Sequence, residues 1–413
     1  MSRSDAPTAA AAPPVDDADR RARTAALACM VGLAVVLGVG RFAFTPLLPL
    51  MLADGSIGLK AGGWLASANY AGYFVGAVSC AALRFAPARM VRFGLVATVL
   101  LTAAMGVGHL LPVWLAVRFV AGVVSAWTFV FVSQWGLRRL TELHAPEWSG
   151  VIYAGPGVGI VVTGLIGSAL VGQRAASGWL GFAALSAVLS VAIWRTFAVA
   201  PAQAGAPRGA APHAAAATAA TPAPTHRHRA DAAWLVVLYG MPGFGYIITA
   251  TFLPVIARAA LPAGSPWPDL FWPMFGAALI VGAITAARLP GHWDNRLLLA
   301  AGCATQALGI AAGIVWPNAA GFSVGSALLG LPFTAITLFA MREARRLHGE
   351  RAAGLMGYAT ASYGVGQILG PLVAAPLAAR FGSFSPALWV AVAALLLGAA
   401  GFAATAARGR LQP

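Results

Sequence analysis

The chain has 413 residues, of which 59% are hydrophobic and only 9% are charged, and its mean hydropathy is +0.78. Soluble domains carry about 25% charged residues, so this composition excludes a large soluble protein and predicts a polytopic membrane protein. A net charge of +15 would suggest nucleic-acid binding in a soluble protein. In a membrane protein the position of the basic residues matters more than their sum, and we expect no nucleic-acid partner.

Apolar runs long enough to cross about 30 Å of hydrocarbon recur along the chain. They predict twelve transmembrane helices in two sets of six, which makes the protein all-α. The first set occupies residues 24–197 and the second residues 233–406. The individual runs are 24–52, 60–84, 90–110, 112–138, 148–172, 177–197, 233–258, 268–290, 295–316, 318–342, 351–379 and 384–406.

Three segments lie outside these runs. Residues 1–23 are rich in Ala, Pro, Asp and Arg and are expected to form a disordered tail, and residues 407–413 form a second tail. Residues 198–232 lack apolar periodicity, which is typical of a flexible linker between two halves. The histidines there could bind a metal, but we interpret them as solvated and expect neither a metal nor a cofactor; they are His213, His226 and His228.

Basic residues predict the orientation. With the N-terminus inside, inner segments hold 21 of the 27 basic residues, and outer loops hold four, namely Lys60, Arg174, Arg258 and Arg380. Because positively charged loops stay in the cytoplasm, we expect both termini and the linker to be cytoplasmic. The strong preference for arginine over lysine is typical of a GC-rich bacterial genome, which favours a bacterial inner membrane.

The two halves of the chain repeat each other. Glycines recur at nearly one offset, between 205 and 207 residues, in three pairs: Gly40 with Gly245, Gly76 with Gly282, and Gly157 with Gly364. A steady offset indicates duplication of a six-helix unit. Two parallel six-helix repeats resemble the plan of major facilitator transporters, which bind substrate between the halves near the midplane.

Two local motifs strengthen this resemblance. Arg118 stands four residues before Gly122 in the fourth run, and this spacing resembles the major facilitator motif of that helix. The fifth run carries Gly155-Pro156-Gly157-Val158-Gly159, which is similar to a motif of exporters in that superfamily. Residues 40–49 (GRFAFTPLLP) and 63–73 (GWLASANYAGY) resemble the YbfB/YjiJ family of bacterial major facilitator proteins. The resemblance implies an inner-membrane transporter and no particular substrate.

The first cytoplasmic loop departs from the superfamily pattern. That loop normally has an Asp followed by basic residues that lock helix ends, but residues 84–89 (RFAPAR) contain no acid. The equivalent loop of the second half, residues 290–296, keeps Asp294 and Arg296. We therefore expect a cytoplasmic charge latch at these two residues.

Arg41 and Arg118 are the charged residues expected deep inside the runs, both in the outer half of the membrane. A guanidinium at that depth costs several kcal/mol unless it meets water, a partner or a ligand. Every Asp and Glu falls in a tail, a loop or a helix end, so neither arginine has a predicted carboxylate partner. Two guanidiniums can clamp a carboxylate, which predicts that the pair lines a substrate cavity. The alternative is that each donates to backbone carbonyls and fixes helix packing.

Further polar residues share helix faces in pairs, three or four residues apart. We expect these pairs to face the cavity, whereas hydrogen bonding between helices is the alternative interpretation. The pairs are Asn69 with Tyr73, Tyr246 with Thr249, and Tyr363 with Gln367.

Proline and glycine residues predict where helices bend. Pro46 has no N–H to donate to the carbonyl of Phe42, and Pro49 has none for Thr45. A Gly-Pro step loosens a helix and lets a neighbour approach closely. We expect helix flexibility or gating at Pro46, Pro49, Gly155, Pro156 and Gly157.

Together these features predict a monomeric secondary transporter that works by alternating access in the lipid bilayer. The arginine pair and the tyrosines favour a small organic anion with an aromatic or apolar part, and a coupled proton would travel on the substrate carboxylate. Export of apolar or cationic drugs is one alternative, and a non-transporting membrane sensor or scaffold is another. No nucleophile–base pair, metal cluster or phosphate loop is recognisable in the sequence, so we expect no enzyme.

Overall fold

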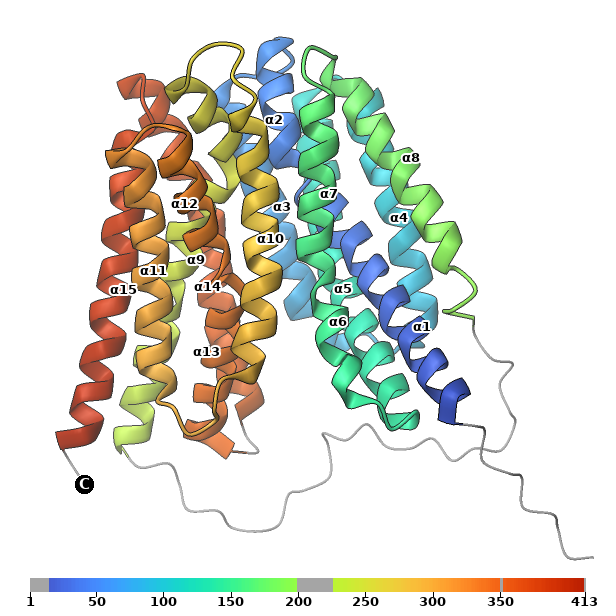
Figure 1. Cartoon of the computed structure of the whole chain (residues 1–413), viewed down its shortest axis with the longest axis vertical. Coiled ribbons are helices and arrows are strands. Elements are labelled where there is room, and N and C mark those ends of the chain that lie inside the picture. The colour runs from blue at the N-terminus through green and yellow to red at the C-terminus, as the bar shows by residue number, and fades with distance from the viewer. Residues whose placement is uncertain (1–14, 199–225, 350–351, 412–413) are drawn as a thin grey trace, which may run out of the picture.

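The structure is a computed structural model that describes residues 15–198, 226–349 and 352–411, and these residues form helices and no strands. Figure 1 shows two side-by-side bundles, which we call the N lobe (α1–α8) and the C lobe (α9–α15). The N-lobe helices are α1 (Val15–Leu33), a π-helix (Ala34–Val39), α2 (Phe44–Ala53), α3 (Leu59–Ser79), α4 (Pro87–Val107), α5 (Leu111–Glu142), α6 (Ser149–Tyr153), α7 (Gly155–Ala169) and α8 (Ala175–Ile193). The C-lobe helices are α9 (His226–Ala260), α10 (Trp267–Arg288), α11 (Asn295–Val315), α12 (Ala319–Gly330), α13 (Phe333–His348), α14 (Ala352–Phe381) and α15 (Ser385–Leu411).

Helices lie at all twelve predicted membrane spans. Eleven helical segments among the described residues are long and apolar enough to cross a bilayer. The twelfth expected span is α3, a helix of 21 residues that is less apolar because it carries Lys60, Asn69, two tyrosines and several glycines. Three spans are built from more than one element, namely α1 with the π-helix and α2, α6 with α7, and α12 with α13.

Helix α1 begins earlier than expected. It starts at Val15, so its first two turns fall within the segment 1–23 for which we predicted disorder. Ala22 is fully buried, and the indole Nε1 of Trp148 donates to the Asp19 carboxylate at 3.2 Å. Packing against the short 3₁₀-helix Pro146–Trp148, which precedes α6, therefore extends α1 beyond the membrane span.

Helix α9 likewise begins at His226, inside the predicted linker 198–232. His226 and His228 belong to this helix, whereas His213 lies outside the described residues. Ala232 and Leu235 are buried against the C lobe, which anchors the start of α9 to the bundle.

The first span is broken in its middle. A π-helix ends at Val39, residues 40–43 form a turn, and α2 starts at Phe44. The Thr45 N–H donates to the Phe42 carbonyl at 3.2 Å, so our expectation that Pro46 leaves the Phe42 carbonyl free was wrong. Because Pro46 has no N–H, the Phe42 carbonyl accepts its hydrogen bond from Thr45, one residue earlier in the chain, and the turn is tighter as a result. π-helical turns often occur at functional sites, and this one places Arg41 at the break.

Glycines let α3 and α5 pack backbone against backbone. A Cβ on Gly72 would lie 1.9 Å from the Phe119 carbonyl oxygen, and one on Gly122 would lie 2.0 Å from the Asn69 carbonyl oxygen. No side chain can occupy such a space. The contact therefore depends on glycine on both helices, as in other close membrane-helix pairs.

The repeated glycines make corresponding contacts in the two lobes. Gly76 of α3 packs against the backbone of Val123 in α5, and Gly282 of α10 packs against that of Leu331 between α12 and α13. Two further glycines face the opposite lobe, where Gly157 meets Ile280 of α10 and Gly364 meets Phe74 of α3. The pair Gly40 and Gly245 makes different contacts in the two lobes. Gly40 lies against Thr98 of α4, and Gly245 lies against Leu395 of α15.

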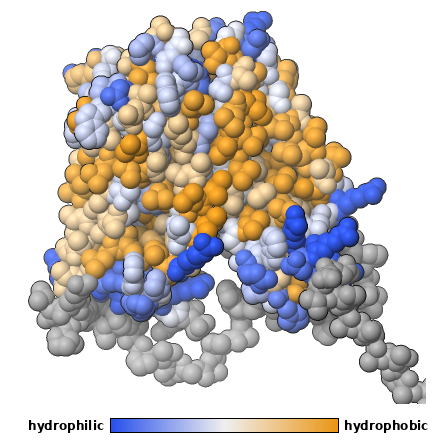
Figure 2. Space-filling view, in the orientation of Figure 1, coloured by the Kyte–Doolittle hydropathy of each residue, from blue (hydrophilic) through white to orange (hydrophobic). Residues whose placement is uncertain are grey.

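We call the end of the molecule where α1 begins and α15 ends the terminal end, and the opposite end the distal end (Figure 1). The lobes contact each other through α3 with α14, α7 with α10, and α2 with α9. Toward the distal end, Ser67 Oγ donates to the Ile368 carbonyl at 2.8 Å and Thr45 Oγ1 to the Ala250 carbonyl at 3.1 Å. Toward the terminal end the lobes diverge, and Figure 2 shows an indentation between them.

Replacing Gly122 with alanine is expected to destabilise the protein, because the added methyl group meets the backbone of α3 rather than a flexible side chain. Overpacking of this kind costs about 1–3 kcal/mol, so the Tm of the purified protein should fall by several degrees. Gly181→Ala is the matched control, since no atom lies within 4 Å of the position that its Cβ would take. Equal Tm values for the two variants would contradict the packing described here.

Candidate functional site

Arg118 is enclosed by the N lobe. The residue is 1% exposed, and its guanidinium donates to the backbone carbonyls of Gly40 and Arg41, both at 3.2 Å. The same group lies 5.0 Å from the ring of Phe44. Hydrogen bonds to backbone carbonyls are what we expect if Arg118 serves helix packing. They hold the broken first span against α5.

Asn69 belongs to the same arrangement. Its side-chain nitrogen donates to the backbone carbonyl of Arg118 at 2.9 Å, across the close contact between α3 and α5. Asn69 is fully buried. Asn69 and Arg118 together therefore fix the relative positions of α3, α5 and the turn that carries Arg41.

Arg41 points the other way, toward the C lobe. Its guanidinium donates to the Gln367 side-chain oxygen of α14 at 3.1 Å. It lies 4.1 Å from the ring centre of Tyr73 and 5.1 Å from that of Tyr70, both on α3. No acidic group forms an ion pair with Arg41 within the described part of the chain. The positive charge is thus surrounded by an amide and by aromatic faces, which stabilise it only in part.

Tyrosines of the C lobe continue this cluster. The Gln367 side-chain nitrogen donates to the hydroxyl of Tyr246, whose ring is stacked 5.8 Å from that of Tyr363. Tyr363 in turn lies 4.9 Å from Tyr239, and Tyr246 lies edge-on to Phe333 at 5.0 Å. We call Arg41, Tyr73, Tyr246, Tyr363 and Gln367 the Arg41 cluster. All five were proposed from the sequence, and the fold brings them together from both lobes.

Thr249 does not join this cluster. It is 9% exposed, and its hydroxyl forms no hydrogen bond with any residue that the structure describes. A residue that we did not single out, Tyr70, lies beside Arg41 instead. The Tyr70 hydroxyl lies 3.0 Å from that of Thr251, which connects α3 to α9 across the lobes. Tyr70 stands three residues before Tyr73, so the shared helix face was the available signal.

The proposed flexible positions lie where lobes or helices meet. A Cβ on Gly167 would lie 2.7 Å from Pro46, so α2 packs closely on α7. Pro49 lies inside α2. Gly155 and Pro156 begin α7 after a one-residue break from α6, and Gly157 faces α10 of the other lobe. The Gly-Pro segment thus adjoins the contact between the lobes.

Comparisons with known proteins identify this architecture. Residues 33–402 match the family model described as the uncharacterised MFS-type transporter YbfB. The chain belongs to this family. It is therefore a multi-pass membrane transporter of the major facilitator superfamily and not an enzyme. No curated protein matches the chain in sequence.

Solved structures support the same fold. The nucleoside transporter NupG aligns with a TM-score of 0.70 at 11% sequence identity, covering 93% of this chain and 98% of that one. A second structure, of a point mutant of NupG, gives the same TM-score at 13% identity, covering 92% and 99%. At this identity the similarity establishes the major facilitator fold alone.

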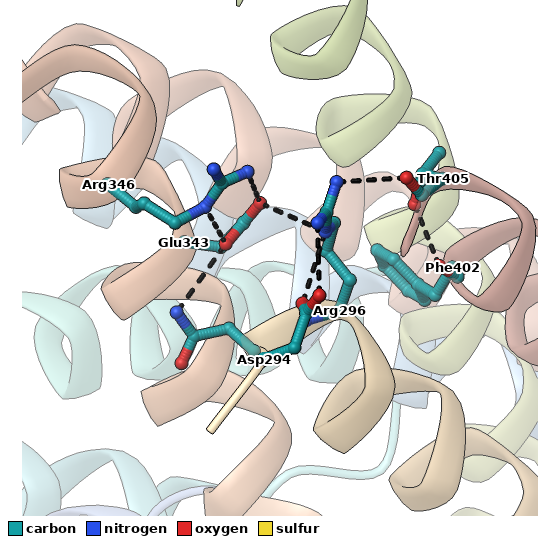
Figure 3. A network of polar contacts seen from close by, with 7 residues as sticks. Asp294, Arg296, Glu343, Arg346, Phe402 and Thr405 are labelled. Atoms are coloured by element: carbon teal, nitrogen blue, oxygen red, sulfur yellow. Dashed lines mark hydrogen bonds and ion pairs between the residues drawn. The ribbon is translucent and has the colours of Figure 1, made fainter. Parts of the chain in front are cut away.

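A charge network joins helices of the C lobe at the terminal end of this MFS protein (Figure 3). Arg296 bonds to the Asp294 carboxylate at 3.0 Å and donates to the Thr405 carbonyl at 2.9 Å. Glu343 bonds to Arg346 at 2.6 Å and lies 3.9 Å from Arg296. The network therefore ties α11, α13 and α15 together inside one lobe, and the described contacts of the proposed latch residues do not cross to the N lobe.

Glu343 was missed in the sequence analysis. It lies just beyond the run 318–342, and we placed every acid in tails, loops or helix ends. Helix α13 continues to His348, and Glu343 within it is 2% exposed. A buried acid at this end of the bundle is tolerated because Arg346, Arg296 and Asn295 surround it.

The N lobe has a corresponding contact without acids. Arg92 of α4 donates to the carbonyl of Trp194 at 2.9 Å and lies 4.8 Å from its ring centre. Arg296 makes the equivalent bond from α11 to the Thr405 carbonyl in α15. The absence of an acid in residues 84–89 is thus matched by a simpler arginine–carbonyl connection.

Arg118→Ala is expected to destabilise the transporter strongly. The substitution leaves two buried carbonyls of the broken span without donors, and each such group costs about 1–3 kcal/mol. The Tm of the purified protein should fall well below that of Arg195→Ala, which removes an exposed arginine at the terminal end. If Arg118 only bound substrate and did not pack helices, the substitution would leave the Tm of the ligand-free protein unchanged.

Asp294 gives the charge network a pH dependence. Partial burial favours the neutral acid, but hydrogen bonds from Arg296 and its charge outweigh this effect and hold the pKa of the Asp294 carboxyl below its usual value. The associated stability is present above the unfolded-state pKa of about 3.9 and is lost as the pH falls through the lower folded-state pKa.

Asp294→Asn should therefore lower the Tm near neutral pH, and the difference from the unmodified protein should shrink as the pH falls below about 4. Thermal unfolding across a pH series measures this difference. A constant difference at every pH would exclude ionisation of Asp294 as its source.

Proposed function

We propose that the protein is a secondary active transporter of a small organic anion, with the Arg41 cluster as the substrate site. The observation that supports this most directly is the environment of Arg41. The side chain is 5% exposed, lies between the lobes and has only a neutral amide and aromatic rings as partners among the described residues. A buried guanidinium in such surroundings gains most from an anion that completes its hydrogen bonding.

The neighbouring rings fit the apolar part of such a substrate. Tyr246 and Tyr363 are stacked, and Tyr73 lies against Arg41 itself. Aromatic faces favour a planar or apolar group, while the guanidinium favours a carboxylate. An aromatic or apolar carboxylic acid meets both preferences.

Alternating access would require the distal contacts to open. The lobes are joined there by neutral hydrogen bonds from Thr45, Ser67 and Tyr70, each with a net contribution of about 0.5–1.5 kcal/mol. Gly157 and Gly364 lie between the lobes without side chains to interlock. These features support rocking of whole lobes around the Arg41 cluster.

The basic residues support a cytoplasmic terminal end. In that orientation the indentation between the lobes (Figure 2) would face the cytoplasm of a bacterial inner membrane, which supports an inward-facing state. A coupled proton would travel on the substrate carboxylate, since the described spans offer no acidic residue near Arg41. We propose that one chain transports by itself, because both lobes of a single chain complete the cluster.

A second candidate is a transporter of neutral apolar or drug-like compounds. The stack formed by Tyr239, Tyr246 and Tyr363 favours it, because aromatic rings bind such compounds without any charge. In that case Arg41 would serve packing alone.

Ligand-dependent thermal stability distinguishes the two candidates. Purified protein would be tested against organic acids, amines and neutral aromatic compounds, together with Arg41→Gln, Arg41→Lys and the surface control Arg195→Gln. We expect stabilisation by aromatic or apolar acids, loss of that stabilisation in Arg41→Gln, and no change in the control. A loss of one charged hydrogen bond of about 1.5–3 kcal/mol corresponds to at least about tenfold weaker binding.

Flux of the stabilising acid into proteoliposomes would then test transport itself. Stabilisation by neutral compounds that persists in Arg41→Gln would contradict anion binding and favour the second candidate. Saturable binding without flux in either direction would favour a membrane sensor or scaffold.

A further inference from the structure

A pocket outside the Arg41 cluster opens at the terminal end of the C lobe. It has a volume of about 710 Å³ and lies between the connection from α10 to α11 and the last turns of α13. One wall is formed by residues 291–296, and the other by Arg342, Arg345 and Arg346. Blue, hydrophilic residues gather along this end of the molecule in Figure 2.

Arginines outnumber acids in the pocket. Four arginines line it, against the single carboxylate of Asp294, and Glu343 lies buried behind the wall. Asp294 is bonded to Arg296, and Glu343 binds Arg346 through two hydrogen bonds of 2.6 and 2.8 Å. These two acids thus neutralise two of the arginines (Figure 3).

The remaining two arginines keep most of their donors available. Arg342 donates one hydrogen bond, at 3.4 Å, to the Leu289 carbonyl, and Arg345 is exposed. Neither forms an ion pair with any acid in the described ranges of the chain. The two residues are three apart in α13 and so share one helix face. His292 and the half-exposed Trp293 lie on the facing wall.

We propose that this pocket binds a phosphate group through Arg342 and Arg345. Guanidinium groups match the geometry of phosphate oxygens and can bind them through paired hydrogen bonds. The network of Asp294, Arg296, Glu343 and Arg346 holds the walls of the pocket in place. The site is separate from the Arg41 cluster, and it does not depend on the proposed substrate.

Two sources can supply the phosphate. One is the headgroup of an anionic phospholipid, which basic clusters at the cytoplasmic surface attract. Trp293 favours this source, because tryptophan prefers the depth of the lipid headgroups. The other is a soluble phosphate ion, and both sources present the same oxygens to the arginines.

The test uses the 413-residue chain and two double variants of it. Arg342→Gln/Arg345→Gln removes the proposed ligands, and Arg138→Gln/Arg195→Gln removes the same charge from the terminal end of the N lobe, where both side chains are exposed. Thermal stability is titrated with phosphatidylglycerol in mixed micelles against phosphatidylcholine. A parallel titration compares inorganic phosphate with chloride at equal ionic strength.

We expect saturable stabilisation by at least one phosphate source in the unmodified protein and in the N-lobe control. In the C-lobe variant the apparent Kd should be about tenfold weaker or more, since two charge-assisted bonds are lost. Selectivity for phosphatidylglycerol alone would identify the lipid as the ligand, and saturation by inorganic phosphate alone would identify the soluble ion. If the C-lobe variant has a lower ligand-free Tm, Arg345→Gln alone is compared with Arg195→Gln.

Equal affinities in the C-lobe variant and the unmodified protein would overturn the proposal. So would an equal loss in the N-lobe control, because it would show a general effect of positive charge. Absence of stabilisation by both phosphatidylglycerol and inorganic phosphate would overturn it as well.

Discussion

A buried guanidinium without a carboxylate must be stabilised by neutral groups, and the centre of this transporter is built around that requirement. Arg118 meets it by bonding to two carbonyls that the break in the first span presents. One of these carbonyls belongs to Arg41, so Arg118 positions the backbone of Arg41. Arg41 is thereby directed away from its own lobe and toward Gln367 of the other.

Close helix packing makes this arrangement possible. Glycines at positions 72 and 122 bring the backbones of α3 and α5 together, and only at that separation can Asn69 reach the Arg118 carbonyl. The same helix α3 carries Tyr70 and Tyr73 beside Arg41. Backbone contact between two helices of one lobe therefore sets the position of side chains that face the other lobe.

The two ends of the molecule are held by different forces. Neutral side-chain bonds to backbone carbonyls connect the lobes toward the distal end, and their modest net strength is compatible with opening and closing. At the terminal end, ion pairs connect helices within the C lobe alone. Ion pairs among partly buried groups are costly to break, so they favour a lobe that moves as one unit. This division of forces supports the proposal that whole lobes rock around the Arg41 cluster.

Much of the fold follows from the sequence because bilayer thickness and backbone hydrogen bonding leave few choices. Runs of apolar residues had to become helices, and the steady glycine offset already indicated two related halves. The sequence also identified the residues of the Arg41 cluster, since polar side chains are rare in such helices and stand out. Helix ends were predicted less well, because packing outside the membrane extended α1 and α9.

Only the tertiary structure decided what each arginine contacts. Arg41 and Arg118 are both arginines expected at the same depth in the membrane, yet their partners differ. Arg118 donates to backbone carbonyls, whereas Arg41 contacts an amide and aromatic rings from both lobes. The tertiary structure also revealed Glu343 as a buried acid within a charge network. Hydropathy and spacing predict the depth and helix face of a residue in the bilayer. The partner of a buried charge depends instead on which helices pack side by side. That packing depends on contacts between residues up to 326 positions apart in the chain.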